Sequence, residues 1–339
     1  MRPMRWLEKK AAEWYAETEW IAGFNYVPST AVNSTEMWQS ETYDRETIDR
    51  ELKLAAEAGY NACRVFLQYL VWENERERFM RNFENFLHIA DINGITVMPV
   101  LFDDCAFAGR EPYLGAQDGP KPGVHNSGWT PSPGAAIADD PAMEASLSKY
   151  VKEIIGAFKD DRRIIVWDLY NEPGNNNRGP KCLPLVEKAF LWAREAGPSQ
   201  PLTVGVWEFK EYDLSFAEMS DVVSFHDYSK YEESEAKIAA LKQYGRPLIC
   251  TEWLHRINGN NFANHLPLYR HHGVGVYNWG LVTGKTQTNL SWDTMRGQPD
   301  SEPDIWQQDI FYPGGTPYRE DEVKLLREFR NAGRGTINM

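Results

Sequence analysis

The chain has 339 residues, of which 42% are hydrophobic, and it carries a formal net charge of −13 at pH 7. This length suits a single large α/β domain, and the apolar content is high enough for an extensive core, which excludes a disordered chain. Because the charge is acidic and no Lys/Arg-rich stripe occurs, we expect no nucleic-acid partner and favour a neutral substrate over a polyanionic one.

The first residues, MRPMRWLEKKAAEWYAETEW, are charged and amphipathic and lack the apolar core of a signal peptide. The sequence as it stands therefore predicts a cytoplasmic protein, whereas a secreted or periplasmic location stays open if a leader had been removed. No apolar run reaches the ~18 residues of a membrane span, so no membrane partner is expected. The sequence gives no indication of the oligomeric state.

Strand-like and helix-like segments alternate along the chain. Apolar runs predict strands over 20–28, 60–70, 95–103, 164–172, 202–209, 222–228, 247–254 and 273–282. Amphipathic stretches predict helices over 44–59, 79–94, 143–158, 184–196, 233–244, 262–271 and 319–330. Gly59 and Gly94 stand where C-cap glycines are expected.

This alternation is typical of βαβ units and a parallel sheet. Eight such units predict a single (β/α)₈ TIM barrel over 1–339, with an extra N-terminal helix within 1–19 that caps the bottom of the barrel. A doubly wound open sheet is the alternative, but FNYVPST after the first strand is no glycine-rich phosphate turn. Long loops, 103–142 after the third strand and 283–318 after the eighth, are expected to form walls of the active site.

Polar side chains are predicted at the carboxyl ends of the strands, where TIM barrels hold their active sites. They are Asn25, Arg64, Asp103, Asp104, Asn171, Glu172, His226, Tyr228, Glu252 and Trp279. Burial of such charges is costly unless they pair with one another, and a functional site explains that cost best.

Glu172 and Glu252 end the fourth and seventh predicted strands, which lie on opposite sides of a barrel mouth. Two facing carboxyl groups suit glycoside hydrolysis, in which one protonates the leaving oxygen and the other attacks the anomeric carbon. Burial and a neighbouring negative charge would keep the acid protonated, and a nearby arginine would keep the nucleophile ionised.

Together these motifs resemble the clan of retaining (β/α)₈ glycosidases that includes the family 5 cellulases and mannanases. The similarity extends over about 20–282 and rests on Asn171-Glu172-Pro173, Glu252, Arg64 in NACRVFL, His226 and Tyr228 in HDY, and Trp279 in YNWG. Bacterial proteins described as cellulase-like or xylanase-like are also similar.

The resemblance implies a role for each matching position. Glu172 would be the acid/base and Glu252 the nucleophile, with Asn171 on the sugar 2-hydroxyl and Arg64 orienting the nucleophile. The same resemblance puts His226 and Tyr228 near the sugar ring and makes Trp279 the platform beneath it.

Family 5 enzymes often carry a histidine after the third strand, where this chain has Asp103 and Asp104. His125 in VHNSGW is the candidate for that place, and the two aspartates are expected to bind sugar hydroxyls or to form an ion pair with Arg64. Further candidate sugar platforms are Trp129, Trp207, Trp253, Trp292 and Trp306.

No metal or cofactor is expected, because the cysteines are far apart without a Cys-x-x-Cys and no His-x-His or His-Glu-x-x-His occurs. Asp168 is interpreted as a buried polar residue of the barrel without a catalytic role. The sequence leaves open a sugar-binding barrel without catalysis, transglycosylation in place of hydrolysis, and an open cleft in place of a pocket. It also leaves the sugar unnamed.

Overall fold

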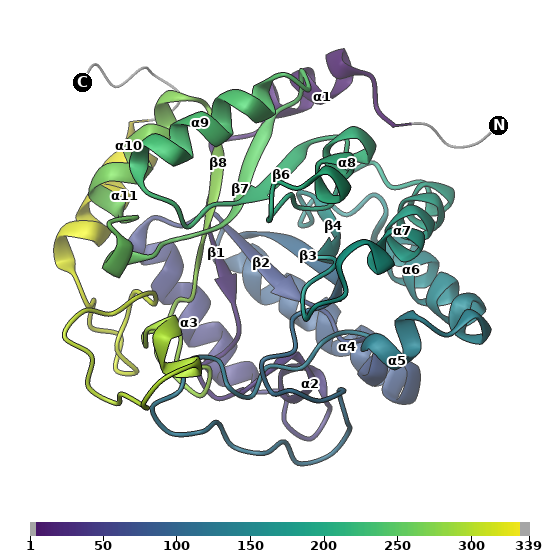
Figure 1. Cartoon of the computed structure of the whole chain (residues 1–339), viewed down its shortest axis with the longest axis horizontal. Coiled ribbons are helices and arrows are strands. Elements are labelled where there is room, and N and C mark those ends of the chain that lie inside the picture. Colours follow the sequence, from purple (N-terminus) through teal and green to yellow (C-terminus); the bar gives the residue numbers. More distant parts are fainter. Residues whose placement is uncertain (1–4, 333–339) are drawn as a thin grey trace.

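The computed structural model describes residues 5–332, which form an eight-stranded parallel barrel surrounded by helices (Figure 1). The strands run in the order β5-β4-β3-β2-β1-β8-β7-β6. A parallel bridge between Val206, three residues after β5, and Phe225 of β6 closes the remaining gap of the barrel. The strands are β1 (Ala22–Tyr26), β2 (Ala62–Phe66), β3 (Thr96–Asp103), β4 (Trp167–Asn171), β5 (Leu202–Thr203), β6 (Val223–His226), β7 (Leu248–Trp253) and β8 (Gly275–Trp279).

The helices alternate with these strands, as predicted for a TIM barrel. They are α1 (Glu8–Glu17), α2 (Ser34–Trp38), α3 (Arg45–Ala58), α4 (Tyr69–Ile92), α5 (Ala135–Ala138), α6 (Glu144–Phe158), α7 (Leu183–Ala196), α8 (Glu211–Met219), α9 (Tyr231–Lys242), α10 (Phe262–His271) and α11 (Glu320–Asn331). Among the residues that the structure describes, no helix combines the length and apolarity needed to cross a membrane.

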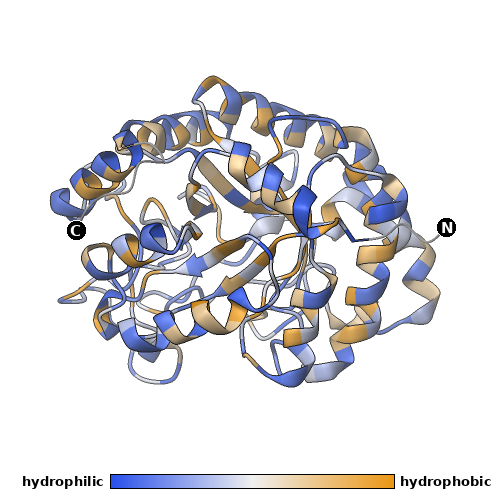
Figure 2. Ribbon diagram, turned by 90° about the horizontal axis from the view of Figure 1, so that it is seen from above, coloured by the Kyte–Doolittle hydropathy of each residue, from blue (hydrophilic) through white to orange (hydrophobic). Residues whose placement is uncertain are grey.

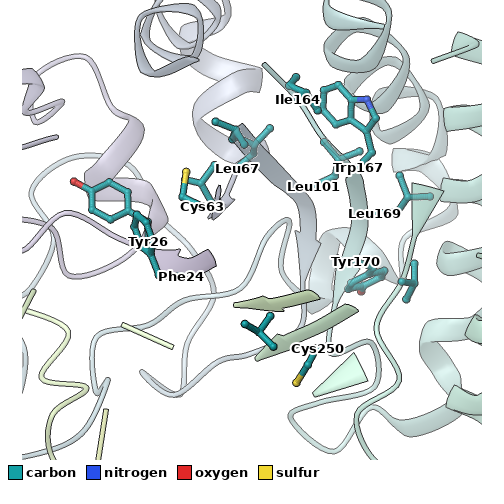
Figure 3. Close-up of a cluster of buried hydrophobic side chains, with 14 of the residues drawn as sticks. Phe24, Tyr26, Cys63, Leu67, Leu101, Ile164, Trp167, Leu169, Tyr170 and Cys250 are labelled. Carbon is teal, nitrogen blue, oxygen red and sulfur yellow. The ribbon is translucent and has the colours of Figure 1, made fainter. Parts of the chain in front are cut away.

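The main core lies between the barrel and the surrounding helices. Figure 3 shows part of it, where outward-facing side chains such as Cys63, Leu101 and Trp167 pack together. Hydrophobic and hydrophilic residues alternate along the helices (Figure 2), so each helix can bury one face against the sheet and expose the other. This burial of apolar area is what holds the helices on the barrel.

A second apolar cluster fills the bottom of the barrel. It contains Ile21, Ala62, Met98, Val166, Val222, Ile249 and Tyr277, and Trp14 and Tyr15 of α1 pack against it. The ring of Tyr277 lies so close to Gly23 that a Cβ at this position would overlap it. Glycine at residue 23 therefore allows the ring to fill the barrel interior.

The short helices α2 and α5 were not predicted, and three further elements, β5, α8 and α4, differ from the sequence prediction. β5 is much shorter than the predicted strand 202–209, and it is followed by α8, which was not predicted. The reason is Asp213, whose carboxylate accepts the backbone N–H groups of 207–210 and so draws the chain into a helix N-terminus. α4 begins at Tyr69 rather than near residue 79, because Gln68 caps the N–H of Leu70.

Candidate active site

A pocket of about 570 Å³ opens at the carboxyl ends of the strands. The strand ends contribute Asn171, Glu172, His226, Tyr228, Glu252 and Trp279 to its lining. The loop after β3 adds Cys105, Phe107, His125, Asn126 and Trp129, and the loop after β8 adds Trp292, Met295, Arg296 and Gln308. Both long loops therefore form walls of the pocket, as predicted.

Glu252 lies at the end of β7 and is held by two donors. Arg64 Nη1 donates to Oε1 at 2.9 Å, and the Tyr228 hydroxyl donates to Oε2 at 2.8 Å. Ile249 faces the barrel interior and Cys250 the outer core, so regular alternation would turn residue 252 outward. The pairing register with β8 shifts between Cys250 and Trp253, and this irregularity directs Glu252 into the mouth.

Arg64 is completely buried beneath the pocket and connects several strands. Its guanidinium bonds Asp168 Oδ2 at 2.8 Å, Asn25 Oδ1 at 2.8 Å and Asn171 Oδ1 at 2.6 Å, in addition to Glu252. Asp168 is also completely buried, so the two charges compensate each other inside the barrel. Arg64 thereby fixes the position of Glu252 through a planar group with few degrees of freedom.

Glu172 follows β4 in a left-handed backbone conformation, with φ of 41°. Such a conformation is costly for a residue with a side chain and is often found at functional sites. Its carboxylate accepts hydrogen bonds from His226 Nδ1 at 2.8 Å, Cys105 Sγ at 3.2 Å and Asn175 Nδ2 at 2.5 Å. The side chain is thus directed into the pocket by three donors.

The two carboxyl groups have pKa shifts of opposite direction. Burial raises the pKa of Glu252, and the nearby charge of Glu172 adds to this, although His226 and Arg64 oppose it. Burial also acts to raise the pKa of Glu172, but the hydrogen bond and charge of His226, with the other donors, outweigh it and lower that pKa. These directions are the reverse of those predicted from the sequence, because His226 Nδ1 lies nearer to Glu172, at 2.8 Å, than to Glu252, at 3.5 Å.

Asn171 is oriented by Asp103, its partner on the neighbouring strand β3. Asn171 Nδ2 donates to Asp103 Oδ1 at 2.9 Å, while Trp129 Nε1 donates to Asp103 Oδ2 at 2.7 Å. Burial raises the pKa of Asp103 to about 7, and the hydrogen bonds from Asn171, the Cys105 N–H and Trp129 oppose that rise. Asp103 therefore fixes which way the Asn171 amide faces.

Aromatic rings form the wall beside these groups. Trp279 makes edge contacts with Phe66 at 5.6 Å and with Trp129 at 6.1 Å between ring centroids. Trp292 meets Tyr228 edge-on at 4.8 Å. Trp279 is only partly buried and lines the pocket, so its exposed face can stack on a flat ligand.

Four predicted substrate-binding residues do not line the pocket, namely Asn25, Arg64, Asp103 and Asp104. Arg64 and Asp103 bond residues of the pocket lining, and Asn25 accepts a hydrogen bond from Arg64. Asp104 instead accepts hydrogen bonds from Tyr170 at 2.7 Å and from the Gly174 N–H at 2.8 Å, and pairs with Arg178 at 3.1 Å. Neither aspartate pairs with Arg64, which corrects that expectation.

The other predicted residues are divided between the pocket and the core. His125 lines the pocket beside Trp129, Trp207 and Trp292, and burial lowers the pKa of His125 to about 4. Trp253 does not line it, because its ring packs in the core against Phe262 and Tyr269. Trp306 is also absent from the lining and stacks on Tyr318 at 4.5 Å.

Two residues that contact Glu172 were not predicted from the sequence. Cys105 was interpreted only as one of four separate cysteines, and Asn175 was not considered. A signal for Asn175 was present, because it follows Glu172 by three residues in the turn after a strand. No local signal identifies Cys105, whose approach to Glu172 depends on the fold of the β3 loop.

One oxygen each of Glu172 and Glu252 and a ring nitrogen of His226 lie within 4.8 Å of one another. Among the described residues this is the group whose spacing could hold a metal ion. Glu172 is hydrogen-bonded to His226 and Asn175, and Glu252 is hydrogen-bonded to Arg64 and Tyr228. That arrangement suits proton transfer and nucleophilic attack.

The sequence profile of the cellulase family (glycosyl hydrolase family 5) matches residues 22–284. No curated protein matches the chain in sequence. Among solved structures, an exo-β-1,4-mannosidase from Opitutaceae bacterium strain TAV5 is similar, with 16% identity and a TM-score of 0.65. The match covers 92% of this chain, which spans only 59% of that protein.

Two further solved structures share the fold. A family 5 mannosidase from Rhizomucor miehei has 14% identity and a TM-score of 0.58, and the match covers 94% of each chain. An endo-β-1,4-mannanase from Thermotoga petrophila has 15% identity and a TM-score of 0.57, with 93% of this chain and 77% of that one covered. At these identities the similarity concerns the fold.

Proposed function

The chain belongs to glycosyl hydrolase family 5 and is a glycosidase, and on that premise we propose that it cleaves neutral β-linked glycosides by double displacement. In this proposal Glu252 is the nucleophile and Glu172 the acid/base. The observation that carries it is the distance of at most 4.8 Å between an oxygen of each carboxyl group. Retaining enzymes hold these groups about 5–5.5 Å apart, whereas inverting enzymes need about 6.5–9.5 Å to admit a water.

In the first step, an oxygen of Glu252 bonds to the anomeric carbon while the bond from that carbon to the leaving oxygen breaks. Glu172 transfers its proton to the leaving oxygen, so that an alcohol departs. Arg64 and Tyr228 bond the Glu252 oxygens at 2.9 Å and 2.8 Å and so hold the carboxylate for attack.

In the second step, Glu172 takes a proton from a water whose oxygen bonds to the anomeric carbon, and the ester bond to Glu252 breaks. Two inversions give net retention of configuration. Because His226 Nδ1 bonds Glu172 Oε1 at 2.8 Å, the proton that Glu172 donates and regains lies within a hydrogen-bonded pair. His226 is thus a positioning residue for the acid/base.

For the substrate, we propose a β-mannoside as the first candidate. The support is indirect: three structurally similar proteins are described as mannosidases or a mannanase. The pocket itself favours an uncharged sugar at the centre, because the one arginine that bonds Glu252, Arg64, is already paired with the buried Asp168 and does not line the pocket.

The proposal is tested with aryl β-D-mannopyranoside, glucopyranoside and xylopyranoside and with aryl glycosides of the matching trisaccharides. We expect turnover, with the first product in the β configuration by NMR; an α product at first would contradict double displacement. Glu252→Ala should abolish turnover, and a 2-fluoro aryl glycoside should label the Glu252 peptide of the unaltered enzyme in mass spectrometry.

Glu172→Ala separates the acid from the nucleophile. We expect a large loss of kcat/KM for substrates with a poor leaving group and a smaller loss with dinitrophenolate, which departs without a proton. Azide should restore activity to the variant and give a β-glycosyl azide as product. Glu187→Gln, at an exposed position of α7, is the control and should retain full activity. Equal losses for both leaving groups would contradict the role of Glu172.

A further inference from the structure

We propose that the pocket is closed on the glycone side, so that the enzyme removes one sugar at a time from the non-reducing end of a β-linked chain. The inference rests on the proposed function and adds the mode of action to it. It depends on how the loops after β3 and β8 join each other, which is visible at the bottom and lower left of Figure 1.

The two loops are connected along a seam of hydrogen bonds, which we call the loop seam and define as 121–126 with 286–300. Asn126 N–H donates to the Thr286 carbonyl at 2.8 Å, and His125 N–H to Thr294 Oγ1 at 2.9 Å. His125 Nδ1 lies 2.8 Å from the Leu290 carbonyl. These contacts join segments about half the chain apart in the sequence.

Gln287 contributes the side-chain part of the loop seam. Its Oε1 accepts the Gly123 N–H at 3.0 Å, and its Nε2 donates to the carbonyls of Lys121 at 2.8 Å and Val124 at 3.0 Å. A further backbone bond runs from the Asp300 N–H to the Gly123 carbonyl at 2.9 Å. The loops are therefore joined at several points and form one wall.

The wall is also attached to the loops after β1 and β2. On the β1 side, Lys285 N–H donates to the Ser29 carbonyl at 3.0 Å, and Asn33 Nδ2 donates to the Gly128 carbonyl at 3.0 Å. On the β2 side, Gln68 Nε2 donates to the Pro131 carbonyl at 3.2 Å. Neither the β1 loop nor the β2 loop contributes a residue to the lining of the pocket, so the pocket ends at this wall.

The loop seam reaches the nucleophile, because its Trp292 meets the ring of Tyr228 at 4.8 Å and the Tyr228 hydroxyl bonds Glu252; we place the opening on the other side, at the acid/base. Within the wall His125 is 3% and Trp129 1% exposed, and Trp129 contacts Trp279, the proposed platform of the first sugar. Glu172 is next to Asn175, and nearby Phe107 in the same lining is 41% exposed. The leaving group must depart past Glu172, so it leaves through the open side.

We infer that one sugar fits between the wall and the cleaved bond. An endo-acting enzyme must accommodate several sugars on each side of that bond, which requires an open groove where the loop seam lies. We infer that the substrate class is a β-linked oligosaccharide or glycoside with a free non-reducing terminal pyranose, and that the rest of the chain extends past Phe107.

The test uses the sugar that the aryl glycosides select. A linear pentaose of that sugar is labelled at its reducing end, and a second sample is also methylated at O4 of its non-reducing terminus. We expect monosaccharide as the sole unlabelled product from the first sample, with labelled fragments that shorten one residue at a time. The capped sample should be cleaved at least about a hundredfold more slowly.

Gln287→Ala tests the wall itself, because it removes three bonds of the loop seam and no residue of the pocket lining. We expect the capped sample to become a better substrate relative to the uncapped one. Gln243→Ala, at an exposed position outside the pocket, is the matched control and should keep the unaltered ratio.

The outcomes separate the inference from the proposed function. Cleavage of the capped pentaose into internal fragments by the unaltered enzyme, or turnover of aryl trisaccharides but not of aryl monosaccharides, would overturn exo action and leave the glycosidase assignment intact. If no glycoside of the panel is cleaved, the proposed substrate class is what has failed.

Discussion

Tyr228→Phe removes the hydroxyl that donates to Glu252 Oε2 at 2.8 Å and keeps the ring that meets Trp292. Burial and the negative charge of Glu252 raise the pKa of Tyr228 well above its ordinary value, so the hydroxyl retains its proton and acts as a donor. A hydrogen bond to a charged acceptor contributes about 1.5–3 kcal/mol, and each pKa unit corresponds to about 1.36 kcal/mol. The substitution should therefore raise the pKa of Glu252 by about 1–2 units.

The assay measures kcat/KM against pH with an aryl β-glycoside, because the two limbs of that profile give the pKa values of essential groups in the free enzyme. Glu252 attacks only when ionised, so activity is lost as pH falls through its pKa, and a higher pKa moves the acid limb to higher pH. Tyr43→Phe is the control, since the hydroxyl of Tyr43 donates to Asn85 outside the pocket. An acid limb that stays in place or moves to lower pH would refute the reasoning.

Three more predictions concern the groups around the site. Arg64→Met leaves the buried carboxylate of Asp168 unpaired and should lower the unfolding free energy by about 3–5 kcal/mol in urea; Arg64→Met/Asp168→Leu should recover part of this, and no recovery would count against the pairing. Cys105→Ala removes a hydrogen-bond donor to Glu172, so the pKa of Glu172 should rise and the basic limb of kcat/KM against pH should move to higher pH. Cys105→Ser should leave that limb in place, and identical profiles for the two variants would contradict the role of Cys105. Gly23→Ala places a Cβ against a ring inside the barrel and should cost about 1–3 kcal/mol in thermal unfolding, while Gly119→Ala, with nothing near its Cβ, should be neutral.

The barrel could be predicted because its signals are local. Apolar runs of strand length and amphipathic helices recur along the chain, and each reports its own environment. The missing helix α8 shows the limit of this reasoning. It begins where the Asp213 carboxylate accepts a row of backbone N–H groups, and such a turn has no hydrophobic periodicity to detect.

The depth of the polar residues could not be predicted in the same way. Alternation along a strand says which face a side chain takes, but it gives no position along the barrel axis. Arg64 and Asp103 therefore appeared equivalent to residues of the mouth, although both are buried and neither lines the pocket. At Glu252 alternation itself fails, because the register of β7 and β8 is irregular there.

The sequence by itself determined the parallel barrel and the two glutamates that end its fourth and seventh strands. Apolar strand runs and the polar residues at their ends are both features of short segments. The tertiary structure alone decided which carboxyl group His226 favours, that Cys105 reaches Glu172, and that the loop seam closes one side of the pocket. Each of these depends on atoms brought together from segments far apart in the chain. Such contacts form only when the whole chain has folded, so no pattern within a short segment predicts them.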